Sequence, residues 1–328
     1  METAMCGIAG IATVDGGHAS DWLGKAADKM AHRGPDAVGN WWSDDFTVGL
    51  VHRRLAIIDL SESANQPMRD TRGDYCIVVN GEIYNFRELR ADLQSRGHEF
   101  RTQSDTEVIL AAYREWGEQC PLHLKGMFAF AIYDSKRRLL FLARDRAGEK
   151  PLYYALSDGK IRFSSELKGL FADPSTARRI DASALDSYLA YGNVPGEACI
   201  VSGVSKLPPA HALTFDLQSG AVSSWKYWSL PEFSGSAADD SPTETDKLQT
   251  EFQALLMKAV RRQLVSDVPI GVLLSGGVDS SLVTAIAASL TTGLNTFTVR
   301  FPGHDAFDET NHARQVAEFF GTNHTELE

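Results

Sequence analysis

A change of hydrophobic period part-way along the chain constrains the fold more than any other feature. Up to about residue 228, short runs of β-branched and aromatic residues alternate with turn residues, which is typical of antiparallel sheets. After residue 246, apolar residues recur at helical spacing, and these segments alternate with short apolar runs, which indicates a parallel α/β sheet. Residues 229–246 are rich in Ser, Pro, Gly and acidic residues, the composition of a linker. The sequence therefore predicts two domains of different class.

Length and charge narrow the class of partner. The 328 residues suffice for two domains of roughly 100 to 200 residues each. With 32 basic and 43 acidic residues the net charge is -11, which disfavours nucleic acid and anionic membranes and favours small-molecule partners. No apolar run approaches the roughly 18 residues of a membrane span, so we expect a cytoplasmic protein, with a homodimer left open. The four cysteines form no C-x-x-C pair, so neither a zinc cluster nor a disulfide framework is predicted.

Secondary structure follows from the same patterns. Asn85 is a plausible N-cap for one helix, and Val108, Ile109, Ala112 and Trp116 share a face of another. In the first domain we expect strands at residues 6–14, 47–58, 75–79, 127–133, 139–143 and 161–164, and helices at 86–96 and 106–116. In the second we expect helices at 247–265, 280–290 and 311–320, a buried strand at 270–274 and another at 296–301.

A Ser- and Gly-rich loop follows the first strand of the second domain. The string SGGVDSS at residues 275–281 lies between that strand and a helix start, where backbone N–H groups and the helix dipole favour an anion. It is neither a Walker A loop nor a G-x-G-x-x-G loop, and the spacing alone also fits a mere tight connection. The full string resembles the pyrophosphate loop of the N-type ATP pyrophosphatases, which adenylate a carboxylate or carbonyl group.

The thiol of Cys6 lies near the start of the chain. If Cys6 were the first residue of the mature protein, its own α-amine, with a reference pKa of about 7.7 to 8.0, could activate the thiol. Translation from Met5 followed by methionine removal would expose that amine, whereas Glu2 after Met1 would block trimming. We therefore expect residues 1–5 to be a leader or a start site placed too early.

Ordered motifs then identify a family. The chain resembles the glutamine-hydrolysing asparagine synthetases from residue 5 to about residue 327. The motifs are MCGIAG (5–10), HRGPD (32–36), HRRLAIID (52–59), NGEIYN (80–85), SDTEVI (104–109), GMFAF (126–130), RDR (144–146), SELK (165–168) and the SGGVDSS loop. The resemblance implies an N-terminal-nucleophile hydrolase αββα sandwich at residues 6–228, a linker at 229–246, and at 247–328 the start of a parallel α/β sheet like that of the adenine nucleotide alpha-hydrolases.

The same resemblance implies a glutaminase site. Cys6 would attack the side-chain amide of glutamine to form a thioester, with Asn80 and the N–H of Gly81 as the oxyanion hole. Arg54 would grip the α-carboxylate of glutamine, and Asp105 its α-ammonium group. The pocket would be completed by Glu82 and by the backbone of Leu55, Ala56, Ile57 and Ile58. From the residues alone, Arg54 as a surface charge and Asp105 as a helix N-cap remain alternatives, and HRGPD is predicted as a turn without a catalytic role.

In the second domain the resemblance implies an ATP site. The expected contacts are Leu273, Ser275, Gly276, Gly277, Val278, Asp279, Ser280 and Val299, although Leu273 and Val299 would by default be core residues. Asp279 is also the expected ligand of Mg²⁺. The implied reaction converts aspartate, ATP and glutamine to asparagine, AMP, pyrophosphate and glutamate, with Mg²⁺ neutralising phosphate charge.

The second domain is expected to be incomplete. A further nucleotide-contacting segment of the Ser-Gly-Glu-Gly kind and the aspartate-binding positions are absent from these residues. We therefore predict that this polypeptide hydrolyses glutamine without making asparagine. Three alternatives remain: an amidotransferase that acts on another carboxylate, such as a sugar acid or a peptide; a protein like the β-lactam synthetases that lacks glutaminase activity; and a non-catalytic nucleotide-binding fragment.

Overall fold

The computed structural model describes residues 5–15, 21–232, 242–303 and 308–328. It divides into two compact units, unit 1 (Met1–Pro231) and unit 2 (Glu232–Glu328). Residues 1–4 of the expected leader and residues 233–241 of the expected linker lie outside the described part of the chain. Within the described part, no helix is long and apolar enough to cross a membrane.

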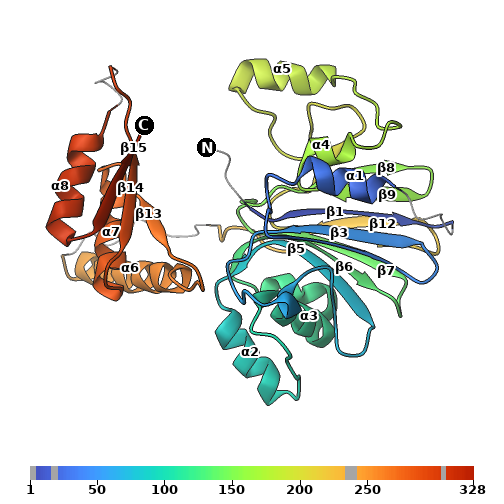
Figure 1. Ribbon diagram of the computed structural model, residues 1–328, viewed down its shortest axis with the longest axis horizontal. Coiled ribbons are helices and arrows are strands. Elements are labelled where there is room, and N and C mark those ends of the chain that lie inside the picture. Colours follow the sequence, from blue (N-terminus) through green and yellow to red (C-terminus); the bar gives the residue numbers. More distant parts are fainter. Residues whose placement is uncertain (1–4, 16–20, 233–241, 304–307) are drawn as a thin grey trace. The chain divides into compact units, whose positions relative to one another are not determined.

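Unit 1 contains two antiparallel sheets of six strands each (Figure 1). The first has the order β10 (Ser205–Lys206), β8 (Tyr153–Ser157), β9 (Lys160–Ser164), β1 (Gly7–Thr13), β3 (Val48–Arg54) and β2 (Ala37–Trp42). The second has the order β12 (Val222–Lys226), β11 (His211–Asp216), β7 (Leu139–Arg144), β6 (Gly126–Asp134), β5 (Tyr75–Ile83) and β4 (Met68–Arg69). In Figure 1 these sheets are stacked face to face.

Helices cover the outer faces of both sheets. Figure 1 shows α1 (Trp22–Lys29) and α4 (Leu167–Leu170) beside the first sheet, and α2 (Phe86–Ser95) and α3 (Asp105–Trp116) beside the second. A further helix, α5 (Ala182–Tyr191), buries only Ala184 among its residues. The 3₁₀ turns are η1 (Glu62–Ala64) and η2 (Gly117–Leu122). The αββα sandwich predicted from the resemblance is thus present.

The core of unit 1 lies between the two sheets. Apolar side chains from both inner faces meet there, among them Leu50, Val78, Leu142 and Phe163, none more than 1% exposed. Gly10 of β1 lies against the ring of Phe163, since a Cβ atom at residue 10 would be 2.4 Å from two ring carbons. A larger residue at position 10 would therefore displace the core, because protein interiors are close-packed.

Most predicted strands of unit 1 are found, with different ends. The apolar run at 47–58 is strand only to Arg54, because the Arg54 side chain binds backbone carbonyl groups of the following residues and turns the chain into a loop. In contrast, β5 continues four residues past the predicted end, to Ile83. The sequence patterns missed α1, α4 and α5 and the short strands β2, β4, β8 and β10 to β12.

Unit 2 is a three-stranded parallel sheet with three helices. The strands are ordered β13 (Gly271–Leu273), β14 (Asn295–Val299) and β15 (Asn323–Leu327), and the helices are α6 (Pro242–Gln263), α7 (Val278–Leu290) and α8 (Thr310–Phe320). The predicted parallel α/β arrangement is confirmed, although β15 was not predicted. The expectation of a fully buried strand at 270–274 is wrong, because Leu274 is 1% exposed whereas Leu273 is 76% exposed.

Candidate functional site

The Cys6 thiol lies where β1 begins and β3 ends. Because β1 and β3 pair antiparallel with Gly7 opposite Arg53, Cys6 lies across from Arg54, the last residue of β3, and next to Leu55. The Leu55 N–H donates to Cys6 Sγ at 3.4 Å, and the thiol donates to the Leu55 carbonyl at 3.6 Å. Burial raises the pKa of Cys6 to about 11, and the Glu82 and Asp105 carboxylates reinforce the shift. The thiol therefore stays protonated at neutral pH unless a base takes the proton.

Arg33 holds the backbone on either side of Cys6. Its Nε donates to the Cys6 carbonyl at 2.9 Å, and its own carbonyl accepts the N–H of Met5 at 2.7 Å. Its Nη1 donates to Glu166 Oε1 at 2.8 Å. The HRGPD motif is thus more than the stapled turn that the sequence suggested, since it fixes the backbone of the predicted nucleophile. Nothing in the spacing of these residues predicts that contact, because it joins positions 27 residues apart.

Arg54, predicted to grip the substrate carboxylate, is buried and holds its own loop. It donates to the Ser61 carbonyl at 2.9 Å, to Asn65 Oδ1 at 2.8 Å, to the Ile58 carbonyl at 3.5 Å and to the Asp59 carbonyl. The alternative of a surface charge is therefore wrong. These bonds shape the backbone at Leu55, Ala56, Ile57 and Ile58, the segment predicted to line the pocket.

The end of β5 carries Asn80, Gly81 and Glu82. Asn80 is 0% exposed, and neither Oδ1 nor Nδ2 has a hydrogen-bond partner among the described residues. Gly81 has φ +149°, and a Cβ atom there would lie 2.1 Å from the Met127 carbonyl oxygen. A buried amide without a partner costs free energy, so Asn80 is a site where a ligand would supply the missing acceptor.

Asp105 joins the start of α3 to the end of β5. Its Oδ2 accepts the Ile83 N–H at 2.8 Å. The N-cap of α3 is Ser104, whose Oγ accepts the Thr106 N–H at 3.1 Å, so the alternative of Asp105 as the cap is wrong. The carboxylate is left to face Glu82 and Cys6. Burial raises the pKa of Asp105, while burial and then the Asp105 charge raise the pKa of Glu82 to about 8. Two carboxylates confined in this way favour a cationic ligand.

A loop after β7 adds a cation to the site. Asp145, 0% exposed, organises this loop, and Lys150 at its end lowers the pKa of Glu82. The Asp145 carboxylate accepts the N–H groups of Phe128, Ala147, Glu149 and Lys150 at 3.2, 3.1, 2.9 and 3.0 Å. Lys150 was absent from the residues predicted for the site.

In unit 2 the SGGVDSS loop precedes α7, which begins at Val278, two residues before the predicted start. Ser275 Oγ lies 3.0 Å from Ser280 Oγ, and Ser280 Oγ donates to the Gly277 carbonyl at 3.1 Å. Gly276 has φ +81°, and a Cβ atom there would be 2.5 Å from His312 Cβ of α8. Only glycine fits at 276, and the bare N–H groups at the helix start suit a phosphate group.

The predicted adenine contacts lie at one edge of the unit 2 sheet. Leu273 is 76% exposed and Val299 49% exposed, at the carboxyl ends of neighbouring parallel strands, where α/β sheets bind ligands. Asp279 lies in the first turn of α7. Within the described residues there is no group of three or more His, Cys, Asp or Glu side chains that could hold a metal ion. Mg²⁺ would thus need phosphate oxygens beside Asp279.

Family models built from known proteins match both halves of the chain. The glutamine amidotransferase domain model matches residues 5–228, and the asparagine synthase model matches residues 251–328. The chain belongs to the glutamine amidotransferase family. The resemblance found in the sequence motifs is therefore confirmed.

The relatives that the chain matches are longer than the chain itself. Asparagine synthetase [glutamine-hydrolyzing] 3 of Bacillus subtilis is 38% identical over 92% of this chain and 50% of its own length. Putative asparagine synthetase [glutamine-hydrolyzing] 2 of Methanocaldococcus jannaschii is 38% identical over 98% of this chain and 64% of its own length. The chain thus spans about half to two thirds of these relatives. A solved structure of the allosteric regulatory enzyme of purine biosynthesis shares the fold, with a TM-score of 0.51 at 12% identity, over 98% of this chain and 90% of that one.

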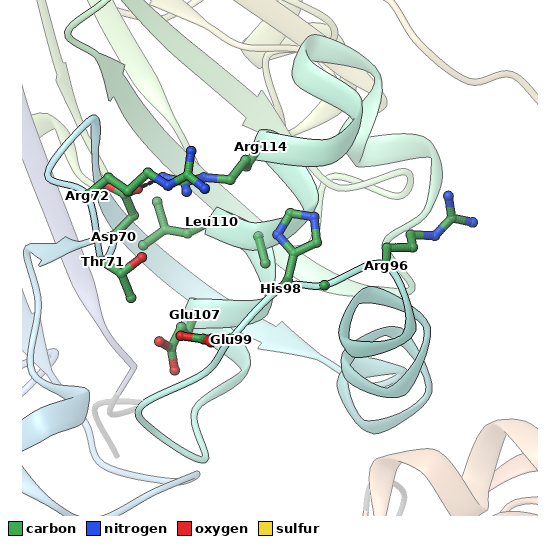
Figure 2. Close-up of a pocket in the computed structure, with 11 residues that line it drawn as sticks. Asp70, Thr71, Arg72, Arg96, His98, Glu99, Glu107, Leu110 and Arg114 are labelled. Atoms are coloured by element: carbon green, nitrogen blue, oxygen red, sulfur yellow. Dashed lines mark ion pairs between the residues drawn. The ribbon is translucent and has the colours of Figure 1, made fainter.

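A separate cavity of unit 1 lies on the outer side of α3 and has a volume of about 400 Å³. Figure 2 shows Arg72 and Arg114 on one side of Leu110, with Glu99 and Glu107 on the other. Charged side chains of this cavity have partners within unit 1: Arg114 pairs with Asp70, and Glu107 accepts the N–H groups of Arg101 and Thr102. None of the residues predicted for the glutamine site lines this cavity.

Proposed function

We propose that unit 1 hydrolyses glutamine with Cys6 as the nucleophile. One observation carries the proposal: a half-buried thiol, a buried amide at Asn80 that has no partner among the described residues, and the paired carboxylates of Glu82 and Asp105 gather around the end of β5. A nucleophile, a donor for a developing negative charge and a site for an ammonium group are the parts that amide hydrolysis of an amino acid needs.

In the proposed reaction Cys6 is the first residue of the mature protein. Its α-amine takes the thiol proton, and the sulfur attacks the side-chain carbonyl carbon of glutamine. The resulting oxyanion accepts hydrogen bonds from Asn80 Nδ2 and the Gly81 N–H, each worth about 2.7 to 4 kcal/mol of barrier. The tetrahedral intermediate expels ammonia, which takes up the proton from the amine, and water then hydrolyses the glutamyl thioester to glutamate.

Recognition of glutamine would use opposite charges at the two ends of the amino acid. Asp105 and Glu82 would hold the α-ammonium group, whose arrival lowers the raised pKa of both carboxyl groups. Arg54 would hold the α-carboxylate, with the Leu55 to Ile58 backbone that it shapes as a second contact. Because Arg54 already binds carbonyl groups of that loop, binding would exchange some of those bonds for substrate contacts.

For the whole protein we propose glutamine-dependent asparagine synthesis. The SGGVDSS loop would hold the phosphates of ATP, with Asp279 beside Mg²⁺, and aspartate would be the carboxylate that is adenylated. Mg²⁺ supplies neutralisation of phosphate charge when it is bound. Ammonia from unit 1 would then replace AMP.

The glutaminase proposal is tested with a protein whose first residue is Cys6. It should convert glutamine to glutamate and ammonia, and an electrophilic glutamine analogue should label Cys6. The Cys6→Ala variant should lose both. The same protein with Met5 retained is the matched control, and it should be at least 100-fold slower because the α-amine is locked in a peptide bond. Equal hydrolysis by the Cys6→Ala variant would refute the proposal.

The identity of the carboxylate that receives the ammonia is tested separately. A protein of the full length of the relatives should form AMP from ATP when aspartate and glutamine are both present. AMP formation with a sugar acid or a peptide carboxylate, but not with aspartate, would replace asparagine synthesis by one of the alternatives. Neither result changes the glutaminase assignment, since the glutamine site lies within unit 1.

A further inference from the structure

Lys150 is a buried cation without a strong partner. The residue is 7% exposed, and its Nζ donates to the thioether sulfur of Met5 at 3.1 Å, a weak acceptor. No carboxylate of the described residues lies within ion-pair distance of Nζ. Burying an ammonium group in this way is costly, so such a group persists where it has a function.

Its position is built into the fold. Asp145 accepts four backbone N–H groups, the last of them from Lys150 itself at 3.0 Å. A buried carboxylate with that many donors fixes the loop, so the lysine side chain starts from a rigid backbone. The Nζ end of the Lys150 side chain is also fixed near the site, because it contacts Met5, and Met5 is joined to Cys6 by one peptide bond. The ammonium group therefore lies near the backbone of residues 5 and 6, within range of a charge interaction with Cys6.

The charges around that position act in opposite directions. Glu82 from β5 and Asp105 from α3 face Cys6 and would hold an α-ammonium group in its charged form. Arg33, Arg54 and Lys150 oppose them, and Glu149 lies on the same loop as Lys150. The carboxylates predicted to bind the ammonium group of glutamine would therefore also keep the catalytic amine protonated, unless a nearby cation offset them.

We propose that Lys150 is a positioning residue that keeps the α-amine of Cys6 in its free-base form near neutral pH. The inference rests on the proposed function, because the amine exists only when Cys6 is the first residue. A cation beside an amine disfavours its protonation and lowers its pKa. The protein would thus hydrolyse glutamine at a pH where the two carboxylates alone would keep the amine protonated and unable to act as a base.

The test is the pH profile of kcat/KM for glutamine in the protein that begins at Cys6. Replacing Lys150 by Met should move the acidic limb to higher pH by about 1 unit, so that activity falls about 10-fold near pH 7 and recovers near pH 9. Lys150→Arg should keep the wild-type limb. If Lys150→Met does not fold, Lys150→Gln, which also removes the charge, takes its place.

Two results would overturn the inference while the proposed function stands. One is an acidic limb that does not move in the uncharged variants, and the other is an equal loss of activity at every pH, which would indicate a structural role. Absence of glutamine hydrolysis in the wild-type protein that begins at Cys6 would instead refute the proposed function, and the inference with it.

Discussion

The two units hold their predicted sites in different ways. In unit 1 the site groups are fixed by partners distant in sequence: Leu55 for Cys6, Ile83 for Asp105 and the HRGPD turn for the backbone of Cys6. In unit 2 the serines of the loop bond mainly to one another, within residues 275–280. A site built from long-range contacts fails when the core is disturbed, whereas a loop built from local bonds depends on a few backbone angles.

Burial shows the same difference. Phe128, Phe130 and Phe163 of unit 1 are at most 1% exposed, whereas Phe252 and Phe319 of unit 2 are 61% and 82% exposed. All six tryptophans and all nine tyrosines of the chain lie between residues 22 and 228. Tryptophan fluorescence therefore reports on unit 1 alone, and the two units can be followed separately in one sample.

The largest expected effect contrasts two glycines. Gly81→Ala should destabilise unit 1 by about 4 kcal/mol, because the Cβ atom would meet a carbonyl oxygen and the positive φ disfavours alanine. In unit 2, Gly277→Ala should change stability by less than about 1 kcal/mol, since the nearest atom would be 3.5 Å away and the φ angle is -70°. Urea unfolding followed by fluorescence and by circular dichroism measures both. Equal losses would mean that the two sites are built alike.

A second contrast uses two aspartates. Asp145→Ala leaves four backbone N–H groups without their acceptor, and we expect a loss of about 3 kcal/mol from unit 1 together with slower glutamine hydrolysis. Asp279→Ala, at an exposed position of α7, should leave the unfolding free energy unchanged within about 0.5 kcal/mol. Glutamine hydrolysis that is unaffected by Asp145→Ala would show that the loop carrying Lys150 does not support the site.

A pH effect should be confined to unit 1. Glu82 has a pKa of about 8 in the folded state, above its ordinary value of 4.5, so the folded state holds a proton that the unfolded state loses. Stability should therefore fall as pH rises from about 5 to about 8, by roughly 3 to 4 kcal/mol from this group. Glu82→Gln should flatten that part of the curve, and Asp105, whose pKa is also raised, should leave a slope of the same sign. A curve of unchanged slope would contradict the raised pKa.

The smallest expected effect separates helix capping from substrate binding. Ser104→Ala removes the cap of α3, and Asp181→Ala removes the cap of α5, so each should cost about 1 kcal/mol. Only Ser104→Ala should also raise KM for glutamine, because Ser104 precedes the Asp105 carboxylate. Thermal unfolding and steady-state kinetics measure the pair. A similar rise in KM for Asp181→Ala would mean that the helix contribution is not local.

The sequence predicted the two fold classes well because each class has its own regular spacing of apolar residues along the chain. Long apolar runs such as β6 and amphipathic helices such as α3 were found nearly at their observed ends. Shorter strands were missed: β12 has four exposed residues of five, so it has no apolar alternation to detect. The end of β3 was placed four residues late, because the Arg54 side chain, rather than the backbone pattern, terminates the strand.

The site residues also divide into those that the sequence predicted and those that it missed. Cys6, Asn80 and Asp105 stand within recognisable motifs, and the structure gathers the Cys6, Glu82 and Asp105 side chains. Arg33 and Lys150 were missed as site residues because their contacts cross 27 and 145 positions of the chain. The sequence of a turn motif, or of a single lysine, does not indicate which residues it contacts in the fold. Only the fold brings Arg33 to the Cys6 carbonyl and Lys150 to the Met5 thioether.

The two contacts of Met5 bear on when the proposed nucleophile could be exposed. Its N–H is bonded to the Arg33 carbonyl and its thioether contacts Lys150, so the half-buried segment at residues 5 and 6 is held by two contacts in the folded unit. An external peptidase needs that segment extended and free. If Cys6 is to start the active chain, cutting this bond is expected to be faster before unit 1 folds than afterwards, because both contacts then have to be broken first.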